Sequence, residues 1–334
     1  MVNIAVIGCG TIADEEHLPA FTSMGDVCVT AVADIDPQRL DLIADRFAVK
    51  ARYEEYRAML RRERIDAVCI CTPNHLHAPM TVDCCRAGKH VLVEKPAATS
   101  MAEISRMKAA AEKAGVILMV EQTQRFQPVN EKARQVIQSG TLGGVTGFRA
   151  TVRSGGPSYW APDSKWFFNK AEAFGGALAD TGIHIIDTIR WITGKEIARV
   201  SGFAANLHGK GDVEDSAVIT LETTDGRLGM IEAAWNNRPN FLTYQVYCEK
   251  GRIETVNYKG LQAALREPQA EMTIDVPGSS ATGGPFRYFI DCVKTGTKPF
   301  VDIEEGGRSL AVVIAGYRSA ATGKAVKVPF SGRA

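Results

Sequence analysis

Three polar side chains in this sequence have the types and spacing for proton and hydride chemistry. Asp180 and His184 are four residues apart, so in a helix both project from one face. His184 can take or give a proton, while Asp180 orients the ring or binds a neighbouring hydroxyl. Lys95 directly precedes Pro96, and its ammonium group can stabilise an oxygen on which charge develops. We therefore expect Lys95, Asp180 and His184 to be catalytic.

Other interpretations of these residues stay open. Asp180 could cap a helix while His184 packs in a core, and Lys95 could be a surface lysine at a strand end. A metal ion could be held by Asp180, His184 and the pair His75 and His77. No ligand-rich cluster accompanies that set, so we expect no metal.

A glycine-rich loop near the N-terminus predicts a dinucleotide site. Gly8-Cys9-Gly10-Thr11-Ile12-Ala13 follows an apolar run and has the pattern G-x-G-x-x-[GA]. The first glycine permits a tight turn and the second lets the backbone approach a pyrophosphate. Asp34 lies 24 residues past Gly10, where a carboxylate can bind ribose hydroxyls. The predicted cofactor ligands here are Gly8, Gly10, Thr11, Ile12 and Asp34, although an ordinary glycine-rich turn is the alternative.

The choice of cofactor depends on the charges beside Asp34. Its carboxylate would repel a 2′-phosphate, and Ile35 offers no cation. Arg39, in the first turn of the next predicted helix, could still reach a phosphate. We expect NAD, with NADP possible.

A parallel sheet must position these groups. Short apolar runs alternate with helical patterns through the first third of the chain, which is typical of a doubly wound Rossmann domain. The predicted strands are Asn3–Ile7, Val27–Ala33, Ala67–Cys71, His90–Val93 and Val116–Val120. The predicted helices are Gln38–Phe47, Tyr53–Arg62, Met80–Ala87 and Met101–Ala114. Asp34, the Thr72–His77 loop and Glu94–Lys95 then fall at the carboxyl ends of strands, where ligands bind.

After residue 122 the pattern changes to long alternating segments, which predict an α+β domain with a large, mainly antiparallel open sheet. Its predicted strands are Arg199–Leu207, Ser216–Thr223, Leu228–Trp235, Leu242–Cys248 and Arg252–Tyr258. Its predicted helices are Pro128–Ser139, Ile183–Ile192, Pro285–Thr295 and Ile303–Thr322. We assign residues 1–122 to dinucleotide binding and residues 123–334 to substrate binding and oligomerisation.

Composition limits the classes of partner. The 334 residues include 39 basic and 38 acidic side chains, a net charge of +1, which argues against a bulk electrostatic grip on nucleic acid or an anionic membrane. No apolar stretch approaches the ~18 residues of a membrane span. The eight cysteines include no C-x-x-C pair and are expected to be reduced thiols in a cytoplasmic protein.

Three further motifs identify a family resemblance. They are Thr72-Pro73-Asn74-His75-Leu76-His77, Glu94-Lys95-Pro96 and the G-G-x-L-x-D-x-G-x-H-x-x-D segment from Gly175 to Asp187. With the glycine loop, they resemble the glucose–fructose oxidoreductase / inositol dehydrogenase / MocA family (Gfo/Idh/MocA). The resemblance implies an NAD(P)-dependent enzyme that transfers a hydride between nicotinamide and a hydroxyl-bearing carbon of a sugar, cyclitol or polyol derivative. It also implies a functional Lys95, often with a cis Lys–Pro bond, and a catalytic aspartate and histidine at Asp180 and His184.

The resemblance extends the set of candidate ligands. It adds Thr72, Pro73, Asn74, His77, Glu94, Lys95 and Gln122 to the cofactor site. Candidate substrate-binding residues are Lys95, Arg125, Trp160, Trp166, Asp180 and His184, and Lys165 lies in the same aromatic stretch, Ser154–Gly176. Arg125 could instead form a structural salt bridge, the tryptophans could be core or interface residues, and His77 could be a surface histidine.

Two other functions use the same elements. One is an enzyme with tightly bound NAD that oxidises its substrate transiently, to eliminate a group or to couple two substrates. The other is a non-catalytic sensor of dinucleotide or sugar, which would need none of Lys95, Asp180 and His184. An open, one-sided sheet needs a partner over its apolar outer face, so we also expect a homodimer or homotetramer assembled through the second domain.

Overall fold

The computed structural model describes residues 1–329 and divides into two compact units. The first unit is Met1–Glu121 with Pro285–Gly307, and the second is Gln122–Gly284 with the chain from Arg308 onward. The division after residue 121 lies beside the predicted boundary, but the structure places Pro285–Gly307 with the first unit. Hydrogen bonds explain this placement: Val120 N donates to Val301 O at 3.0 Å, and Arg287 binds Asp26 at 2.8 Å. Residues 330–334 of the predicted second domain lie outside the described residues.

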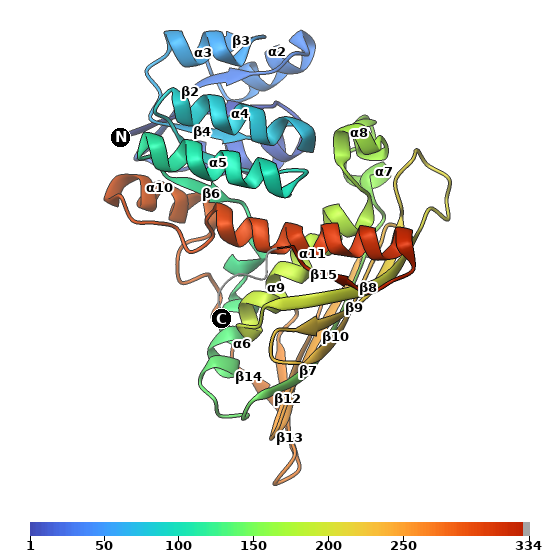
Figure 1. The fold of residues 1–334 in the computed structure, drawn as a ribbon. Helices are drawn as coiled ribbons and strands as arrows, with labels where there is room; N and C mark the ends of the chain where they lie inside the picture. Colours follow the sequence, from blue (N-terminus) through green and yellow to red (C-terminus); the bar gives the residue numbers. More distant parts are fainter. Residues whose placement is uncertain (330–334) are drawn as a thin grey trace. The chain divides into compact units, whose positions relative to one another are not determined.

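The first unit contains a six-stranded, wholly parallel sheet with the order β3-β2-β1-β4-β5-β6 (Figure 1). The strands are β1 (Val2–Ile7), β2 (Val27–Ala33), β3 (Ala51–Tyr53), β4 (Ala67–Ile70), β5 (His90–Val93) and β6 (Leu118–Val120). The order reverses between β1 and β4, which is where doubly wound sheets bind ligands. The predicted Rossmann sheet is confirmed.

Helices connect these strands, and polar side chains cap several of them. They are α1 (Leu18–Thr22), α2 (Pro37–Arg46), α3 (Tyr56–Arg62), α4 (Asn74–Arg86) and α5 (Met101–Ala114), and the unit also contains α10 (Pro285–Thr295), which follows β14 in the chain. A π-helical segment, Ala13–His17, precedes α1. Asp36 accepts hydrogen bonds from the first amides of α2, and Ser100 does the same for α5.

Two predicted boundaries in this unit are wrong. Ala51–Tyr53 is a strand, and Tyr53 was expected to begin a helix. The helix expected from Met80 begins at Asn74, so His75 and His77 lie on α4. Pro79 lies inside α4.

The second unit contains a nine-stranded sheet with the order β14-β13-β12-β11-β7-β10-β9-β8-β15. Its strands are β7 (Val145–Arg153), β8 (Ile197–Ala205), β9 (Ser216–Thr223), β10 (Leu228–Ala234), β11 (Phe241–Cys248), β12 (Gly251–Val256), β13 (Leu261–Leu265), β14 (Ala270–Ile274) and β15 (Val326–Lys327). Only β7 and β10 pair in parallel. The predicted open, mainly antiparallel sheet is confirmed, although β7, β13, β14 and β15 were not predicted.

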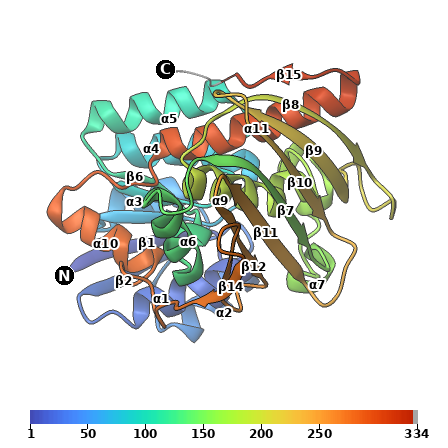
Figure 2. The ribbon, with the colours of Figure 1, turned by 90° about the horizontal axis from the view of Figure 1, so that it is seen from below.

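Helices cover one face of this sheet. They are α6 (Pro128–Gln138), α9 (Ile183–Thr193) and α11 (Ile303–Thr322), the last of which runs from one unit into the other, while α7 (Pro157–Trp160) and α8 (Lys170–Ala173) lie in the stretch between β7 and α9. A π-helical segment, Leu178–Gly182, leads directly into α9. α9 packs against β7 and α6 (Figure 2), and its buried isoleucines form part of the core.

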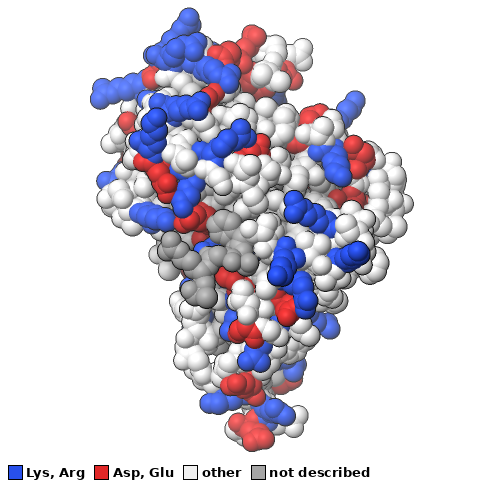
Figure 3. All heavy atoms as spheres, viewed as in Figure 1, with Lys and Arg blue, Asp and Glu red and all other residues white. Residues whose placement is uncertain are grey.

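Charge of both signs is spread over the surface. On the face drawn in Figure 3, basic side chains gather over the end of the first unit that carries α3, with acidic groups among them. Ion pairs such as Arg57–Asp83 and Arg52–Asp41, each at 2.8 Å, belong to this region. Within residues 1–329 no helix combines the length and hydrophobicity that a membrane crossing needs.

Candidate active site

The backbone of the glycine loop after β1 is closely packed at Gly8 and open at Gly10. Gly8 has φ +95°, and a Cβ there would lie 2.6 Å from the carbonyl oxygen of Cys71, so only glycine fits. At Gly10 a Cβ would have no atom within 4 Å. The helix begins at Thr11, which directs its first backbone amides toward this open side. The loop therefore fits a pyrophosphate, which would approach the backbone at Gly10.

Asp34 lies directly against this loop. Its Oδ2 accepts a hydrogen bond from Cys9 N at 2.6 Å, and its Oδ1 accepts one from Asp36 N at 2.9 Å. Arg39 lies on the other side of Cys9: its Nε donates to Cys9 O at 2.6 Å and its Nη2 to Asp14 at 3.1 Å. Arg39 is thus held at the loop by an acidic neighbour.

Two histidines, His17 and His77, bind the turn formed by Glu94, Lys95 and Pro96, which we call the Lys95 turn. The Lys95–Pro96 peptide is cis, as the resemblance implied. Glu94 accepts from Lys95 N at 3.1 Å and contacts His17 Nε2 at 2.9 Å. His77 lies with Nδ1 2.8 Å from Pro96 O and Nε2 2.7 Å from Thr72 O.

His77 therefore joins the two turns that were predicted to hold the cofactor. It is 1 % exposed, so the alternative of a surface histidine does not hold. Its burial lowers the pKa of the ring, and the bonds to Pro96 and Thr72 oppose that effect.

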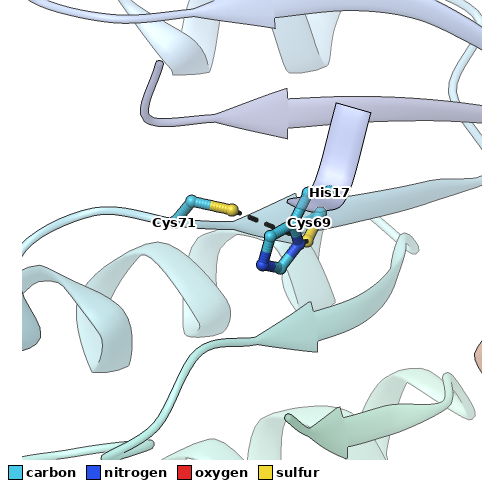
Figure 4. A group of neighbouring side chains, drawn as sticks. All are labelled: His17, Cys69 and Cys71. Atoms are coloured by element: carbon cyan, nitrogen blue, oxygen red, sulfur yellow. Dashed lines mark hydrogen bonds between the residues drawn. The ribbon is translucent and has the colours of Figure 1, made fainter. Parts of the chain in front are cut away.

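His17, which no sequence motif singled out, is the centre of a buried polar cluster. Its Nδ1 lies 2.9 Å from Cys69 Sγ, and Cys71 Sγ lies 3.8 Å from that sulfur (Figure 4). Its Nε2 contacts Glu94 at 2.9 Å and Glu121 at 3.0 Å. Among residues 1–329, His17–Cys69–Cys71 and His17–Glu94–Glu121 are the groups close enough to share a metal ion, and neither includes Asp180 or His184.

The two carboxyl groups of this cluster have pKa values on opposite sides of the ordinary value. Burial opposes the ionisation of Glu94, but the hydrogen bond and the charge of His17 outweigh it and lower the pKa of Glu94 to about 2. Burial raises the pKa of Glu121 to about 7, because the attraction of His17 only partly offsets it and the charge of Glu94 adds to it. One carboxylate and one titrating carboxyl thus lie beneath the Lys95 turn.

Asp180 and His184 lie on one continuous helix whose first turn is π-helical. Asp180 belongs to the Leu178–Gly182 segment and is 8 % exposed, while His184 is in the first turn of α9 and is half-buried. Their spacing keeps both on neighbouring positions of the same helix, as predicted. π-helical turns of this kind occur frequently at functional sites.

The start of this helix is capped by two residues that sequence reasoning missed. The Glu214 carboxylate accepts from Gly176 N and Leu178 N, each at 2.9 Å, and from the Tyr317 hydroxyl at 2.8 Å. That hydroxyl also accepts from Ala179 N at 3.1 Å. The three orphan amides of the helix start are therefore satisfied by side chains.

The same two residues explain the paired glycines of the motif. A Cβ on Gly175 would lie 2.0 Å from the Tyr317 hydroxyl oxygen, and one on Gly176 would lie 1.7 Å from Glu214 O. No side chain fits at either position. The motif therefore encodes close packing against Glu214 and Tyr317 as well as the two polar residues that follow it.

Two other candidates have well-defined surroundings. Arg125 is 2 % exposed and binds Asp187 through Nε at 2.7 Å and Nη2 at 2.8 Å, which is the structural salt bridge considered above. Its contact with substrate stays a prediction. Gln122 is also buried, and neither atom of its side-chain amide has a hydrogen-bond partner among the described residues. A ligand bound beside Gln122 would supply the hydrogen-bond partners that this amide lacks.

The predicted tryptophans belong to an aromatic cluster. Trp160 makes edge contacts with Trp235 and Phe167, at ring-centroid distances of 6.5 and 6.4 Å. Trp166 stacks on Phe167 at 3.8 Å. Trp160 thus packs against the core cluster that contains Trp235, whereas Trp166 is half-buried on Phe167, and stacking of either ring on a sugar stays a prediction.

Comparison with known proteins gives the family. Residues 2–122 match an oxidoreductase family with an NAD-binding Rossmann fold, GFO/IDH/MocA, and residues 130–254 match the GFO/IDH/MocA C-terminal domain. The chain belongs to the GFO/IDH/MocA family of oxidoreductases. The expected resemblance is thus confirmed, and with it an NAD-binding enzyme of the oxidoreductase class.

Individual members of the GFO/IDH/MocA family are similar over the whole chain. The myo-inositol 2-dehydrogenase of Thermotoga maritima is 27 % identical, over 98 % of both chains. The crystal structure of GenD2 from gentamicin A biosynthesis, in complex with NAD, superposes with a TM-score of 0.86 at 27 % identity, over 98 % of this chain and 96 % of that one. A levoglucosan dehydrogenase in complex with NADH and levoglucosan has a TM-score of 0.85 at 25 % identity, over 98 % and 99 %.

Proposed function

We propose that this protein is an NAD-dependent dehydrogenase that transfers a hydride between nicotinamide and a hydroxyl-bearing carbon of a sugar, cyclitol or polyol derivative. The observation that carries the proposal is the Asp180–His184 helix, whose start Glu214 and Tyr317 hold rigidly. The family relatives are dehydrogenases of inositol and levoglucosan, which supports this substrate class.

Three side chains of this chain carry the proposed chemistry. His184 accepts the proton of the substrate hydroxyl as the C–H hydride leaves. Asp180 orients the imidazole or holds a neighbouring hydroxyl. Lys95 donates to the oxygen that becomes a carbonyl and stabilises its developing charge. NAD supplies the hydride acceptor when it is bound.

The cofactor residues predicted above are those we propose to hold NAD. Gly10, Thr11 and Ile12 offer backbone amides to the pyrophosphate, and Asp34 offers its carboxylate to the adenosine ribose. Gln122 offers an amide whose hydrogen bonds a ligand would complete. Arg39 is already paired with Asp14, which favours NAD over NADP.

Activity measurements test this proposal. A panel of polyols, inositols and sugars is offered with NAD or NADP while NADH or NADPH absorbance is followed. We expect reduction of NAD by at least one compound, and a loss of about 10²- to 10⁴-fold in kcat for His184→Asn and for Lys95→Met. Lys50→Met, at an exposed lysine, is the control. Unchanged kcat in Lys95→Met would falsify the assigned chemistry.

The same assay separates the two other functions. An enzyme that oxidises transiently would be purified with bound NAD and would convert substrate without accumulating NADH. A sensor would bind dinucleotide and convert nothing.

We further propose a homodimer or homotetramer formed through the outer face of the nine-stranded sheet. Phe203 opposes Val218 across β8 and β9, and the same row continues to Val256 on β12. All three side chains are exposed, Phe203 by 81 %. A second copy of the chain would cover this mixed face. We also propose a cytoplasmic location, which eight free thiols support.

A further inference from the structure

The second unit contains a pocket whose lining includes none of Lys95, Asp180 and His184. Its cavity of about 280 Å³ is close to the lower end of the range for small-ligand sites, about 300–1,000 Å³. Residues 155–159 and 235–238 line it together with Phe168, His208, Lys210, Val213 and Asp215, and all of them belong to the second unit. The pocket is therefore complete within that unit.

Two glycines hold the aromatic wall of this pocket in place. A Cβ on Gly155 would lie 2.5 Å from Cδ2 of Tyr159, and one on Gly156 would lie 2.8 Å from Cβ of Trp235. Gly156 also has φ +74°, where other residues are strained. The rings of Tyr159 and Trp235 thus lie directly on the backbone and offer apolar surface in fixed positions.

The polar edge of Trp235 has no hydrogen-bond partner within residues 1–329. Trp235 is 7 % exposed, and its indole Nε1 makes no hydrogen bond to any described residue. An indole N–H can only donate, and a buried donor without an acceptor is unfavourable. A ligand atom that accepts a hydrogen bond would satisfy it.

Two cations add to this donor set. The Arg238 guanidinium lies 3.8 Å over the ring of Tyr159, and Lys210 Nζ donates to Ser158 Oγ at 2.9 Å. Both side chains line the pocket and can only donate. Three groups that only donate hydrogen bonds, two of them positively charged, are complementary to a ligand group with several acceptor atoms and a negative charge.

Asp215 provides an acceptor in the same pocket. Its Oδ2 receives hydrogen bonds from Leu207 N at 3.0 Å, from His208 N at 2.7 Å and from His208 Nδ1 at 2.9 Å, with the histidine as donor. These contacts hold the carboxylate in place and leave Oδ1 to accept from a ligand hydroxyl. The ligand therefore combines a hydroxyl group with an anionic group.

We propose that this pocket binds the carboxylate end of a sugar acid. The carboxylate accepts from Arg238, Lys210 and Trp235 Nε1, a hydroxyl of the sugar donates to Asp215, and the apolar face of the sugar packs on the aromatic rings. A neutral polyol leaves both cations without an opposite charge. The inference rests on the proposed function because it names the substrate class of that dehydrogenase.

Calorimetry with the full chain and no added cofactor tests the proposal. The probes are D-glucuronate, its neutral amide D-glucuronamide, D-glucose and D-glucose 6-phosphate. We expect D-glucuronate to bind at least about tenfold more tightly than the amide and glucose, with an advantage that shrinks as salt is added. Similar affinities for D-glucuronate and the amide would overturn the proposal, and tighter binding of the phosphate would overturn the assignment to a carboxylate.

Three variants locate the binding. Arg238→Gln and Lys210→Gln should each weaken D-glucuronate binding about tenfold and leave glucose binding unchanged. Trp235→Phe keeps an aromatic ring but lacks the indole N–H, so it should also weaken D-glucuronate binding. Arg266→Gln, at an exposed arginine outside the pocket, is the matched control. Unchanged D-glucuronate affinity in all three pocket variants would overturn the proposal.

Turnover separates this inference from the proposed function. Oxidation of neutral sugars alone, without selective binding of D-glucuronate, would overturn the pocket and leave the dehydrogenase intact. Selective binding of D-glucuronate to a protein that oxidises neither D-glucuronate nor any compound of the panel would support the pocket and overturn the dehydrogenase.

Discussion

At the scale of single residues, the Lys95 turn depends on a histidine far away in the sequence. His17 lies beneath it and contacts Glu94 and Glu121, and each contact joins residues that are more than 70 positions apart. Without the imidazole, two carboxyl groups would be buried close together with no positive charge between them. We infer that His17 positions the Glu94–Lys95 turn.

Replacing Glu121 should change how stability depends on pH. The pKa of about 7 in the folded protein exceeds the ordinary 4.5, so folding takes up a proton between these pH values. The stabilising contribution of Glu121 is thus present below pH 4.5 and lost as the pH rises to 7. Glu121→Gln removes this loss, so the variant should gain up to about 3 kcal/mol of unfolding free energy over the parent across that range.

Urea unfolding at several pH values measures this difference. Glu94, with a pKa of about 2, titrates below the range and does not obscure it. Glu267→Gln, at an exposed position, should run parallel to the parent. If the difference in unfolding free energy between Glu121→Gln and the parent stays constant from pH 4.5 to 7, the raised pKa assigned to Glu121 is refuted.

At the scale of elements, His17 and Asp180 each lie on a π-helical segment that leads into an α-helix. Ala13–His17 precedes α1 and ends with His17, and Leu178–Gly182 precedes α9 and contains Asp180. A wider turn changes the direction of the side chains on it relative to an ordinary α-helix. In the second helix, Glu214 and Tyr317 bind the amides at the start of that turn and thereby set the position of Asp180.

Weakening this cap should reduce both stability and activity. Glu214→Gln keeps one acceptor oxygen but cannot serve both Gly176 N and Leu178 N, so we expect a loss of about 1–2 kcal/mol in unfolding free energy. The dehydrogenase activity should fall with a larger effect on kcat than on KM. Glu271→Gln, in a well-exposed strand position, serves as the control for both measurements. A stable, fully active Glu214→Gln enzyme would show that the cap does not position the site.

At the scale of the whole molecule, the outer face of the second sheet is the main unexplained surface. One row of neighbouring side chains across the strands of this face contains Phe203, Val218 and Val256 together with charged and hydroxyl side chains such as Glu232 and Thr151. Interfaces between subunits combine an apolar centre with a polar rim, and this mixture of side chains fits that pattern. This face accordingly suits a second copy of the chain.

Light scattering decides the oligomeric state. We expect a dimer or tetramer of the 36.1 kDa chain, and dissociation by the double variant Phe203→Lys/Val218→Lys, because like charges would then oppose each other across the interface. Tyr159→Lys, an exposed aromatic away from the sheet, should leave the mass unchanged. A monomeric parent protein would exclude the proposal.

Local patterns predicted much of the fold. The bounds of β2, β5, α5, α10 and α11 agree with prediction, because short apolar runs and capped helices are properties of neighbouring residues. β7 was missed although it lies in the middle of its sheet. Gly147 interrupts its alternation, and its partner strands β10 and β11 lie some 80 to 100 positions further along the chain.

The sequence by itself determined the Rossmann order of elements and the glycine loop, and it proposed Lys95, Asp180 and His184 as candidates, because each motif consists of residues close together along the chain. Only the tertiary structure decided what holds them: His17 under Glu94, Glu214 and Tyr317 at the start of the Asp180 helix, and Asp187 on Arg125. These contacts join distant segments through single polar atoms. No local pattern records them, because a buried carboxylate or histidine acquires its partner only when the chain has folded.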